Sequence, residues 1–188
     1  MNFKSKSSFL IFFFLFTSLH LATSQSIDSI FVNMPARLNP LLNKPTKLKM
    51  LNNYKKQISD SLQNSLWGKS VIIKYDSTYN FIKIQNAANS RMEIFTFKTT
   101  QGNFTIGVIS TVGDTLQNSE IRFFKQDWSR AEVVFRKPDI KDWIKRERIN
   151  ENGTTPAWAT EQVVGIITLE YDVASEHLIA RPNFLKYI

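Results

Sequence analysis

The sequence predicts an α+β domain: an antiparallel sheet of about six to eight strands, a long N-terminal helix and a shorter second helix. Two patterns along the chain lead to this prediction. Apolar residues recur at helical spacing over residues 46–66, and from Val71 onward they alternate with polar residues. Helices have a period of 3.6 residues and half-buried strands a period of two. The segments that join the alternating runs are short, which favours antiparallel hairpins.

The long helix is expected to begin at Thr46 and to end before Gly68. The Thr46 hydroxyl can accept a hydrogen bond from a backbone N–H of the first turn, and glycine is common just after a helix. The apolar face is predicted to comprise Leu48, Leu51, Ile58 and Leu62, widened by Met50, Tyr54 and Leu66. The lysines are interpreted as a solvated face, with an anion patch as the alternative; they are Lys44, Lys47, Lys49, Lys55 and Lys56.

The sheet is predicted from alternating runs bounded by Asp, Ser, Asn or Gly. These runs are residues 71–75, 81–85, 91–97, 104–112, 119–126, 131–137, 163–172 and 177–183. In the run 104–112 one face is apolar, so a half-buried strand with a helix on its apolar side is expected. That face comprises Phe104, Ile106, Val108 and Val112.

The fifth run is predicted to carry an ion pair, and the stretch after it a turn. Asp127-Trp128-Ser129 is predicted to turn, because an Asp side chain can accept a hydrogen bond from the backbone two residues on. Glu120 and Arg122 are two residues apart on a strand and therefore share a face, where they can pair. Trp128 is expected to cap the end of the sheet.

A second helix is predicted from Pro138 to Ile149. Its apolar stripe contains Trp143, and its charges match the helix dipole, with acids near the start and bases near the end. Core packing explains these residues most simply. Contact with lipid or with an acidic partner is the alternative.

Three parts are predicted along the chain. Residues 1–24 have the cationic start, short apolar core and small residues of a secretory signal peptide. The apolar core, from Phe9 to Phe16, is shorter than a membrane span. Residues 25–45 form an arm interrupted by prolines, and residues 46–188 form a single α+β domain. We therefore expect an exported protein of the periplasm or cell envelope that does not span the membrane after signal cleavage.

Composition excludes several kinds of chemistry. The chain has no cysteine and, beyond residue 24, a single histidine, His177. Disulfides, thiolate catalysis and Cys-ligated zinc are therefore excluded. Neither a glycine-rich phosphate loop nor the spacing of a calcium loop is present. The net charge of +8 is spread along the chain. We predict no cofactor, metal or catalytic residue, and we do not expect a nucleic-acid partner.

Several motifs resemble a known family. They are Met34-Pro35, Leu41-Leu42-Asn43-Lys44, Gly68-Lys69-Ser70 and, most specifically, the run from Thr111 to Trp128. Together they resemble the exported bacterial family catalogued as domain of unknown function 3256, over nearly the whole mature chain. The resemblance implies a signal peptide, an α+β fold and an envelope location, and it supplies no activity. The chain departs from the family where Lys49 and Asn52 replace acidic residues.

For function, the sequence favours a non-catalytic exported envelope protein. It is expected to bind another protein or an envelope polymer through an exposed face or edge of the sheet. Arg122, Trp128 and Trp143 are the predicted interaction residues. One alternative is a carboxylate-dependent hydrolase that acts on envelope polymers. The other is an anion-binding protein that uses its basic helices.

Overall fold

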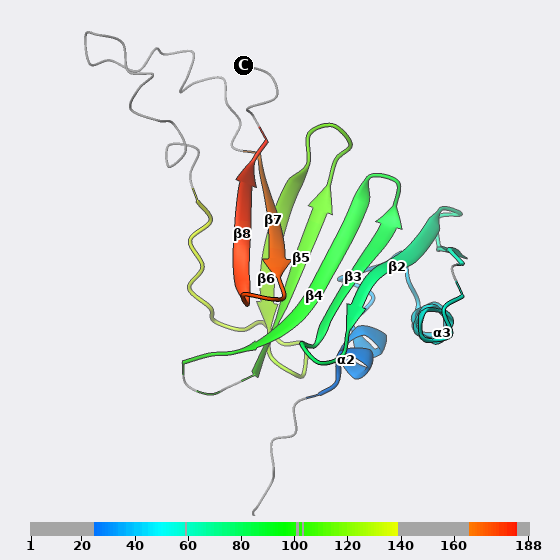
Figure 1. The fold of residues 1–188 in the computed structure, drawn as a ribbon, viewed down its shortest axis with the longest axis horizontal. Coiled ribbons are helices and arrows are strands. Elements are labelled where there is room, and N and C mark those ends of the chain that lie inside the picture. The colour runs from blue at the N-terminus through cyan, green and yellow to red at the C-terminus, as the bar shows by residue number, and fades with distance from the viewer. Residues whose placement is uncertain (1–24, 59, 101, 103, 139–165, 184–188) are drawn as a thin grey trace, which may run out of the picture.

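The computed structural model describes residues 25–58, 60–100, 102, 104–138 and 166–183. In the described part of the chain, two helices precede a sheet of six antiparallel strands in chain order, and a two-stranded hairpin follows (Figure 1). The elements are α2 (Ile27–Asn33), α3 (Lys44–Lys55), β1 (Leu62–Gln63), β2 (Lys69–Asp76), β3 (Phe81–Ala87), β4 (Ser90–Lys98), β5 (Phe104–Val112), β6 (Asn118–Phe124), β7 (Ile167–Asp172) and β8 (His177–Pro182). The predicted antiparallel sheet is confirmed. No described helix has the length and apolar character needed to cross a membrane.

The six-stranded sheet is covered on both faces. On one face, Ile84, Ile94 and Ile106 pack with residues of α2 and α3. On the other, Phe81, Phe95 and Ile109 pack with Ile167, Leu169 and Tyr171 of the β7–β8 hairpin. The expectation that residues 104–112 would be covered on one side alone is therefore wrong. A strand buried twice carries apolar residues at neighbouring positions, as β5 does.

The hairpin lies very close to the sheet at Gly107. The rings of Phe95 and Tyr171 stack almost in parallel, with centroids 3.9 Å apart and 7° between their planes. A Cβ atom on Gly107 would lie 2.3 Å from Cζ of Phe95, which is far inside van der Waals contact. Glycine at this position therefore makes room for the stacked pair.

An ionic tie joins the same two layers. The Lys83 ammonium lies 2.9 Å from Oε1 of the buried Glu93 and 2.8 Å from Oε1 of Glu170 on β7. The first contact is an ion pair without the alignment of a hydrogen bond, and the second is a hydrogen bond. The other oxygen of Glu93 accepts a hydrogen bond from the Tyr171 backbone N–H at 2.9 Å. Burial alone would lower the pKa of Lys83, but its hydrogen bond to Glu170 and the charges of both glutamates raise it above its ordinary value.

The helix α3 is shorter than predicted. Its N-cap is Asn43, whose side-chain oxygen accepts a hydrogen bond from the Thr46 N–H at 2.9 Å, so Thr46 lies inside the helix. The helix ends at Lys55, and Gln57 adopts a left-handed conformation with φ of 57°. The chain then turns back to form β1, so Gly68 does not end a helix. The predicted helix to residue 66 is wrong.

The buried face of α3 also differs from the prediction. Met50 and Leu51 are buried, whereas Leu48 is about half exposed and Leu66 lies beyond the helix. Lys47, which was expected on the solvated face, is only 2% exposed. Its ammonium donates a hydrogen bond of 2.6 Å to the Met34 carbonyl. This bond joins α3 to the segment that follows α2.

The segment before α3 contains α2, which packs deep in the core. Ser26 caps this helix, and Ile27, Ile30 and Phe31 are almost completely buried. Asp28 ties α2 to its neighbours, because it pairs with Lys55 of α3 and accepts a hydrogen bond of 2.7 Å from the Tyr75 hydroxyl of β2. The predicted second helix, residues 138–149, lies outside the described residues after Pro138.

Candidate binding groove along strand β6

Strand β6 is an edge of the six-stranded sheet, and a tight turn follows it. The Asp127 side chain accepts hydrogen bonds from the Ser129 N–H at 2.9 Å and from the Ser129 hydroxyl at 2.6 Å. Trp128 sits at the corner with φ of 65°. The predicted turn at residues 127–129 is confirmed.

After this turn the chain pairs with β6 only briefly. Arg130 forms an isolated bridge with Phe124, and the Ala131 N–H donates to the Phe123 carbonyl at 3.0 Å. The next possible donor, the Val133 N–H, bonds to the Ala131 carbonyl instead. Residues 130–138, which we call the strap, therefore leave the sheet at Ala131. The prediction of a strand at residues 131–137 is wrong.

The departure of the strap leaves part of the β6 edge open. The carbonyl of Phe123 points toward the strap, and outward-pointing backbone groups alternate along a strand. Both backbone groups of Ile121 therefore point outward as well. Within the described part of the chain, the N–H and carbonyl of Ile121 have no backbone partner. The next contact between the strap and β6 is made by a side chain, because Lys137 donates to the Ser119 carbonyl at 3.0 Å.

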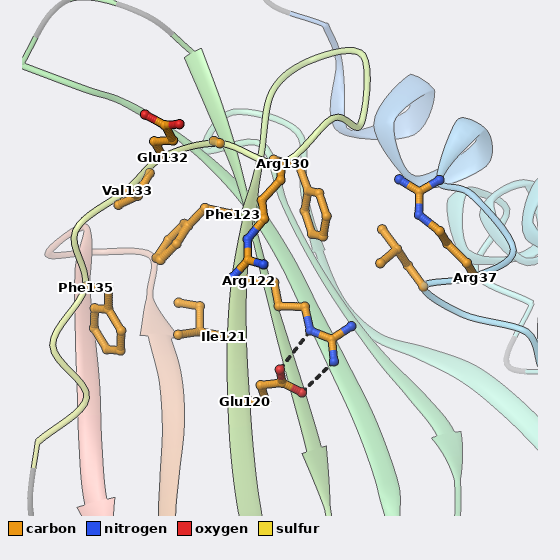
Figure 2. A pocket seen from close by; sticks show the side chains of 12 residues that line it. Arg37, Glu120, Ile121, Arg122, Phe123, Arg130, Glu132, Val133 and Phe135 are labelled. Carbon is orange, nitrogen blue, oxygen red and sulfur yellow. Dashed lines mark hydrogen bonds and ion pairs between the residues drawn. The ribbon is translucent and has the colours of Figure 1, made fainter.

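A groove of about 850 Å³ lies along this open edge (Figure 2). Its walls come from three parts of the chain: β6, the strap and the segment between α2 and α3. Its apolar lining is supplied by Leu38, Ile121, Phe123, Phe124, Ala131, Val133 and Phe135. Its charged lining is supplied by Arg37, Glu120, Arg122, Arg130 and Glu132. The groove thus combines apolar walls, an open strand edge and a small excess of positive charge.

Arg122 and Glu120 form the ion pair predicted from their spacing. Two hydrogen bonds of 2.8 Å join the guanidinium to the carboxylate, as Figure 2 shows. The hydrogen bond from Arg122 holds the pKa of Glu120 below its usual value, and the same contact raises the pKa of Arg122. Both side chains are more than half exposed, so the pair contributes little to stability. Arg122 is therefore able to exchange Glu120 for a carboxylate of a ligand.

The other two arginines of the groove, Arg37 and Arg130, differ in whether their side chains are held by a partner. Arg37 is fixed, because its guanidinium donates a hydrogen bond of 2.9 Å to the Trp128 carbonyl. Arg130 is exposed and, among the described residues, forms no ion pair. Both line the groove with Arg122.

The three predicted interaction residues lie in different surroundings. Arg122 lines the groove. Trp128 is only 6% exposed and packs against Phe124 in the helix-side core, so its ring supports the turn from inside rather than offering a platform to a ligand. Trp143 lies outside the described residues.

The acidic cluster near the C-terminal hairpin serves structure. Glu170 binds Lys83, and Asp172 accepts hydrogen bonds from Ala174 and Ser175 in the turn between β7 and β8. His177 directs Nδ1 at the Ser175 carbonyl and not at a hydroxyl. No group of three or more metal-ligating side chains occurs among the described residues.

Two further grooves are lined by described residues. One of about 640 Å³ lies between α3 and β2 and includes Tyr54, Lys55 and Tyr75. The other, about 610 Å³, is rich in aromatic residues and includes Phe97, Phe104, Phe123, Phe135 and Tyr171. Phe123 and Phe135 line both this aromatic groove and the β6 groove.

Sequence reasoning missed the groove because it missed the strap. Glu132, Val133, Val134 and Phe135 alternate as a strand should, and Val134 is fully exposed. No local pattern marks Ala131 as the point of departure. Near its end the strap is attached to β6 by Lys137, which donates to the Ser119 carbonyl.

Comparisons with other proteins agree with this fold. The profile of the family described as "Protein of unknown function (DUF3256)" matches residues 19–188. No curated protein matches the chain. The chain is similar to a solved structure titled "Structure of a domain of an uncharacterized protein from Porphyromonas gingivalis W83". The TM-score is 0.68 and the identity 17%, over 86% of this chain and 84% of that one. At this identity the likeness shows the fold alone, whereas the profile match spans nearly the whole sequence, and the chain belongs to the DUF3256 family.

Proposed function

We propose that this protein is a non-catalytic binding protein of the cell envelope that holds an extended segment of another protein in the β6 groove. The observation that carries the proposal is the open backbone of Ile121 between two walls. An extended peptide adds to such an edge by main-chain hydrogen bonds, and flanking pockets then select its side chains. Envelope polymers are the second class of ligand for the same groove.

The charges of the groove favour a segment with an acidic residue. Arg130 forms no ion pair among the described residues, and Arg122 holds Glu120 by an exposed contact. A ligand carboxylate near these two guanidinium groups would gain charge-assisted hydrogen bonds. The apolar residues Val133 and Phe135 of the strap would contact a side chain on the opposite side.

The proposal includes export to the periplasm or cell envelope. Its support is the pattern of residues 1–24, which is that of a secretory signal peptide. Partners are therefore sought in envelope extract.

The test compares the wild-type protein with Ile121→Pro. Proline removes the outward N–H of Ile121, which is tolerated on an edge strand because that N–H makes no bond to β5. Ile121→Val is the matched control, because it keeps the N–H. Partners captured from envelope extract are mapped to peptides, and their binding to each variant is measured by titration calorimetry. We expect Ile121→Pro to weaken binding at least about tenfold. The variant lacks one hydrogen bond to the peptide, and the peptide carbonyl that accepted this bond is left buried without a donor.

An NMR measurement makes the test specific to the groove. On addition of the peptide, the amide protons of Ile121 and Phe123 should become protected from exchange with solvent. A partner that binds Ile121→Pro as tightly as Ile121→Val, without protecting these amides, would disprove the proposed mode. Normal circular dichroism of both variants confirms that the fold is intact.

The two alternative functions have less support. Glu93 and Glu170 come together at Lys83, but neither lines any of the three grooves described above. Glu120 and Glu132 line the β6 groove, but Glu120 is held in an ion pair by Arg122. For anion binding by the basic helix, Lys47 is unsuited because it is buried.

A further inference from the structure

The turn between β1 and β2 exposes two large apolar side chains to solvent. Leu66 is 75% exposed and the neighbouring Trp67 is 84% exposed. Most large apolar residues of the described chain lie in one of the two cores. Side chains of this kind held together at the surface commonly mark an interaction site.

Buried hydrogen bonds hold this turn in one conformation. The Asn64 side-chain oxygen accepts hydrogen bonds from the N–H groups of Leu66 and Gly68, each at 3.0 Å. The side-chain nitrogen of Asn64 donates to the Asn86 carbonyl at 2.9 Å and to the Ser70 hydroxyl at 3.2 Å. Since Asn64 is only 8% exposed, the turn is anchored from the protein interior.

Two further features fix the tip. The Ser65 N–H and hydroxyl both donate to the Leu41 carbonyl, at 3.0 and 3.1 Å, which attaches the turn to the segment before α3. Trp67 has φ of 63°, a conformation that is unfavourable for a bulky residue and persists only when the surroundings impose it. The backbone at Leu66 and Trp67 is thus fixed, so little backbone entropy is lost when they bind.

The chain on either side of the tip is rich in basic residues. Between Asp28 and Asp76 the sequence has eight basic residues and a single acidic residue, Asp60. Lys69 follows the tip directly, and α3 lies beside β2 at the same edge of the sheet (Figure 1). The exposed lysines of this edge that form no ion pair with a described residue include Lys44, Lys49, Lys56 and Lys69.

From this arrangement we propose that the protein docks reversibly on an anionic lipid surface, with Leu66 and Trp67 inserted at the interface and the lysines facing the headgroups. Tryptophan favours the membrane–water interface, leucine favours the acyl region, and lysine is attracted to anionic lipid. A second copy of the chain fits less well, because two such basic edges repel each other. The tip lines none of the three grooves described above, so its shape suits insertion into a fluid surface.

The experiment measures cosedimentation of the protein with vesicles of phosphatidylcholine, with and without phosphatidylglycerol. We expect binding to the anionic vesicles that weakens with added salt. The tip variant is Leu66→Ser with Trp67→Asn, because asparagine tolerates positive φ. It should lower the partition coefficient at least about tenfold, since two large apolar side chains no longer leave water. Lys49→Gln and Lys56→Gln should each lower it about fivefold.

Tyr79→Ser is the matched control, because Tyr79 is about half exposed and lies in the neighbouring β2–β3 turn. It should bind vesicles like the wild type. Three results would overturn the proposal: equal vesicle binding by the tip variant, binding that does not depend on phosphatidylglycerol, or a concentration-dependent dimer that the tip variant abolishes. Binding of soluble polyglutamate as tightly as vesicles, with or without the tip, would also overturn it.

Discussion

At the scale of single residues, Lys47 is the most consequential difference between the sequence and the structure. A lysine in a helix with four lysine neighbours suggests a solvated face, yet this one is buried and has the Met34 carbonyl as its partner. Burial lowers its pKa to about 8, and the charge of Lys44 acts in the same direction. A single carbonyl compensates only part of the cost of removing an ammonium group from water.

Lys47 therefore makes stability depend on pH. Its pKa is lower in the folded than in the unfolded protein, so between pH 8 and 10.5 the unfolded state binds more protons and the free energy of unfolding rises with pH. We expect Lys47 to contribute a rise of about 3 kcal/mol over this interval. Lys47→Met should lack that contribution. Urea unfolding at a series of pH values measures the difference between the two proteins.

The exposed Lys49→Met is the control for the removal of charge. Its pH dependence should follow that of the wild type. Parallel curves for the wild type and Lys47→Met would show that the buried ammonium is not the cause.

At the scale of elements, the sequence predicted those whose pattern is set locally. The strands β2 to β6 and the Asp127 turn follow from side chains that act on their own or adjacent strands. The end of α3 does not, because Ile58 and Leu66 continue the helical spacing beyond Lys55. What ends the helix is the docking of Leu62 and Gln63 on β2, a tertiary contact that outweighs local propensity. The groove at β6 was not predicted either, because the path of the strap also depends on tertiary contacts.

The attachment of α2 offers a prediction at this scale. Burial alone would raise the pKa of Asp28, but hydrogen bonds from Lys55 and Tyr75 lower it below its ordinary value. Asp28 thus contributes stability that is present above pH 3.8 and is lost as the pH falls through the folded-state pKa. Asp28→Asn should lose about 1 kcal/mol at neutral pH and should respond less to acid. Acid titration of the unfolding free energy measures both effects.

Asp114→Asn, at an exposed position in the β5–β6 turn, is the comparison. A loss of stability in Asp114→Asn equal to that in Asp28→Asn would assign the effect to net charge and not to the tie between helices and sheet.

At the scale of the whole molecule, a separate hydrophobic core lies on each face of the sheet. The core beneath the helices and the core beneath the β7–β8 hairpin share no residue. Lys83, Glu93 and Glu170 tie the hairpin to the sheet. The sequence predicted the strands of this hairpin, in which Ile167, Leu169 and Tyr171 are buried. It did not predict that they would form a separate sheet, because the face that they cover depends on contacts with Phe81, Phe95 and Ile109, which are distant in the sequence.

The ionic tie should therefore act on the hairpin selectively. Glu93→Ala removes the buried partner of Lys83 and the acceptor for the Tyr171 N–H. We expect a loss of about 3 kcal/mol, typical of breaking a buried pair. Hydrogen exchange followed by mass spectrometry should show that the variant exchanges faster than the wild type in residues 167–182, with a smaller change in α2. Glu120→Ala, which breaks an exposed pair, should change neither.

The order of the strands has a kinetic consequence. Strands β1 to β6 each pair with their neighbour in sequence, so the sheet can form through local contacts and should form early. The hairpin that covers its second face comes much later in the chain, and Tyr171 meets Glu93 across 78 residues. Until the hairpin docks, Phe81, Phe95 and Ile109 would lie open in a nearly finished sheet. Such an intermediate exposes apolar surface to solvent. This chain would therefore be most prone to aggregate before the hairpin docks.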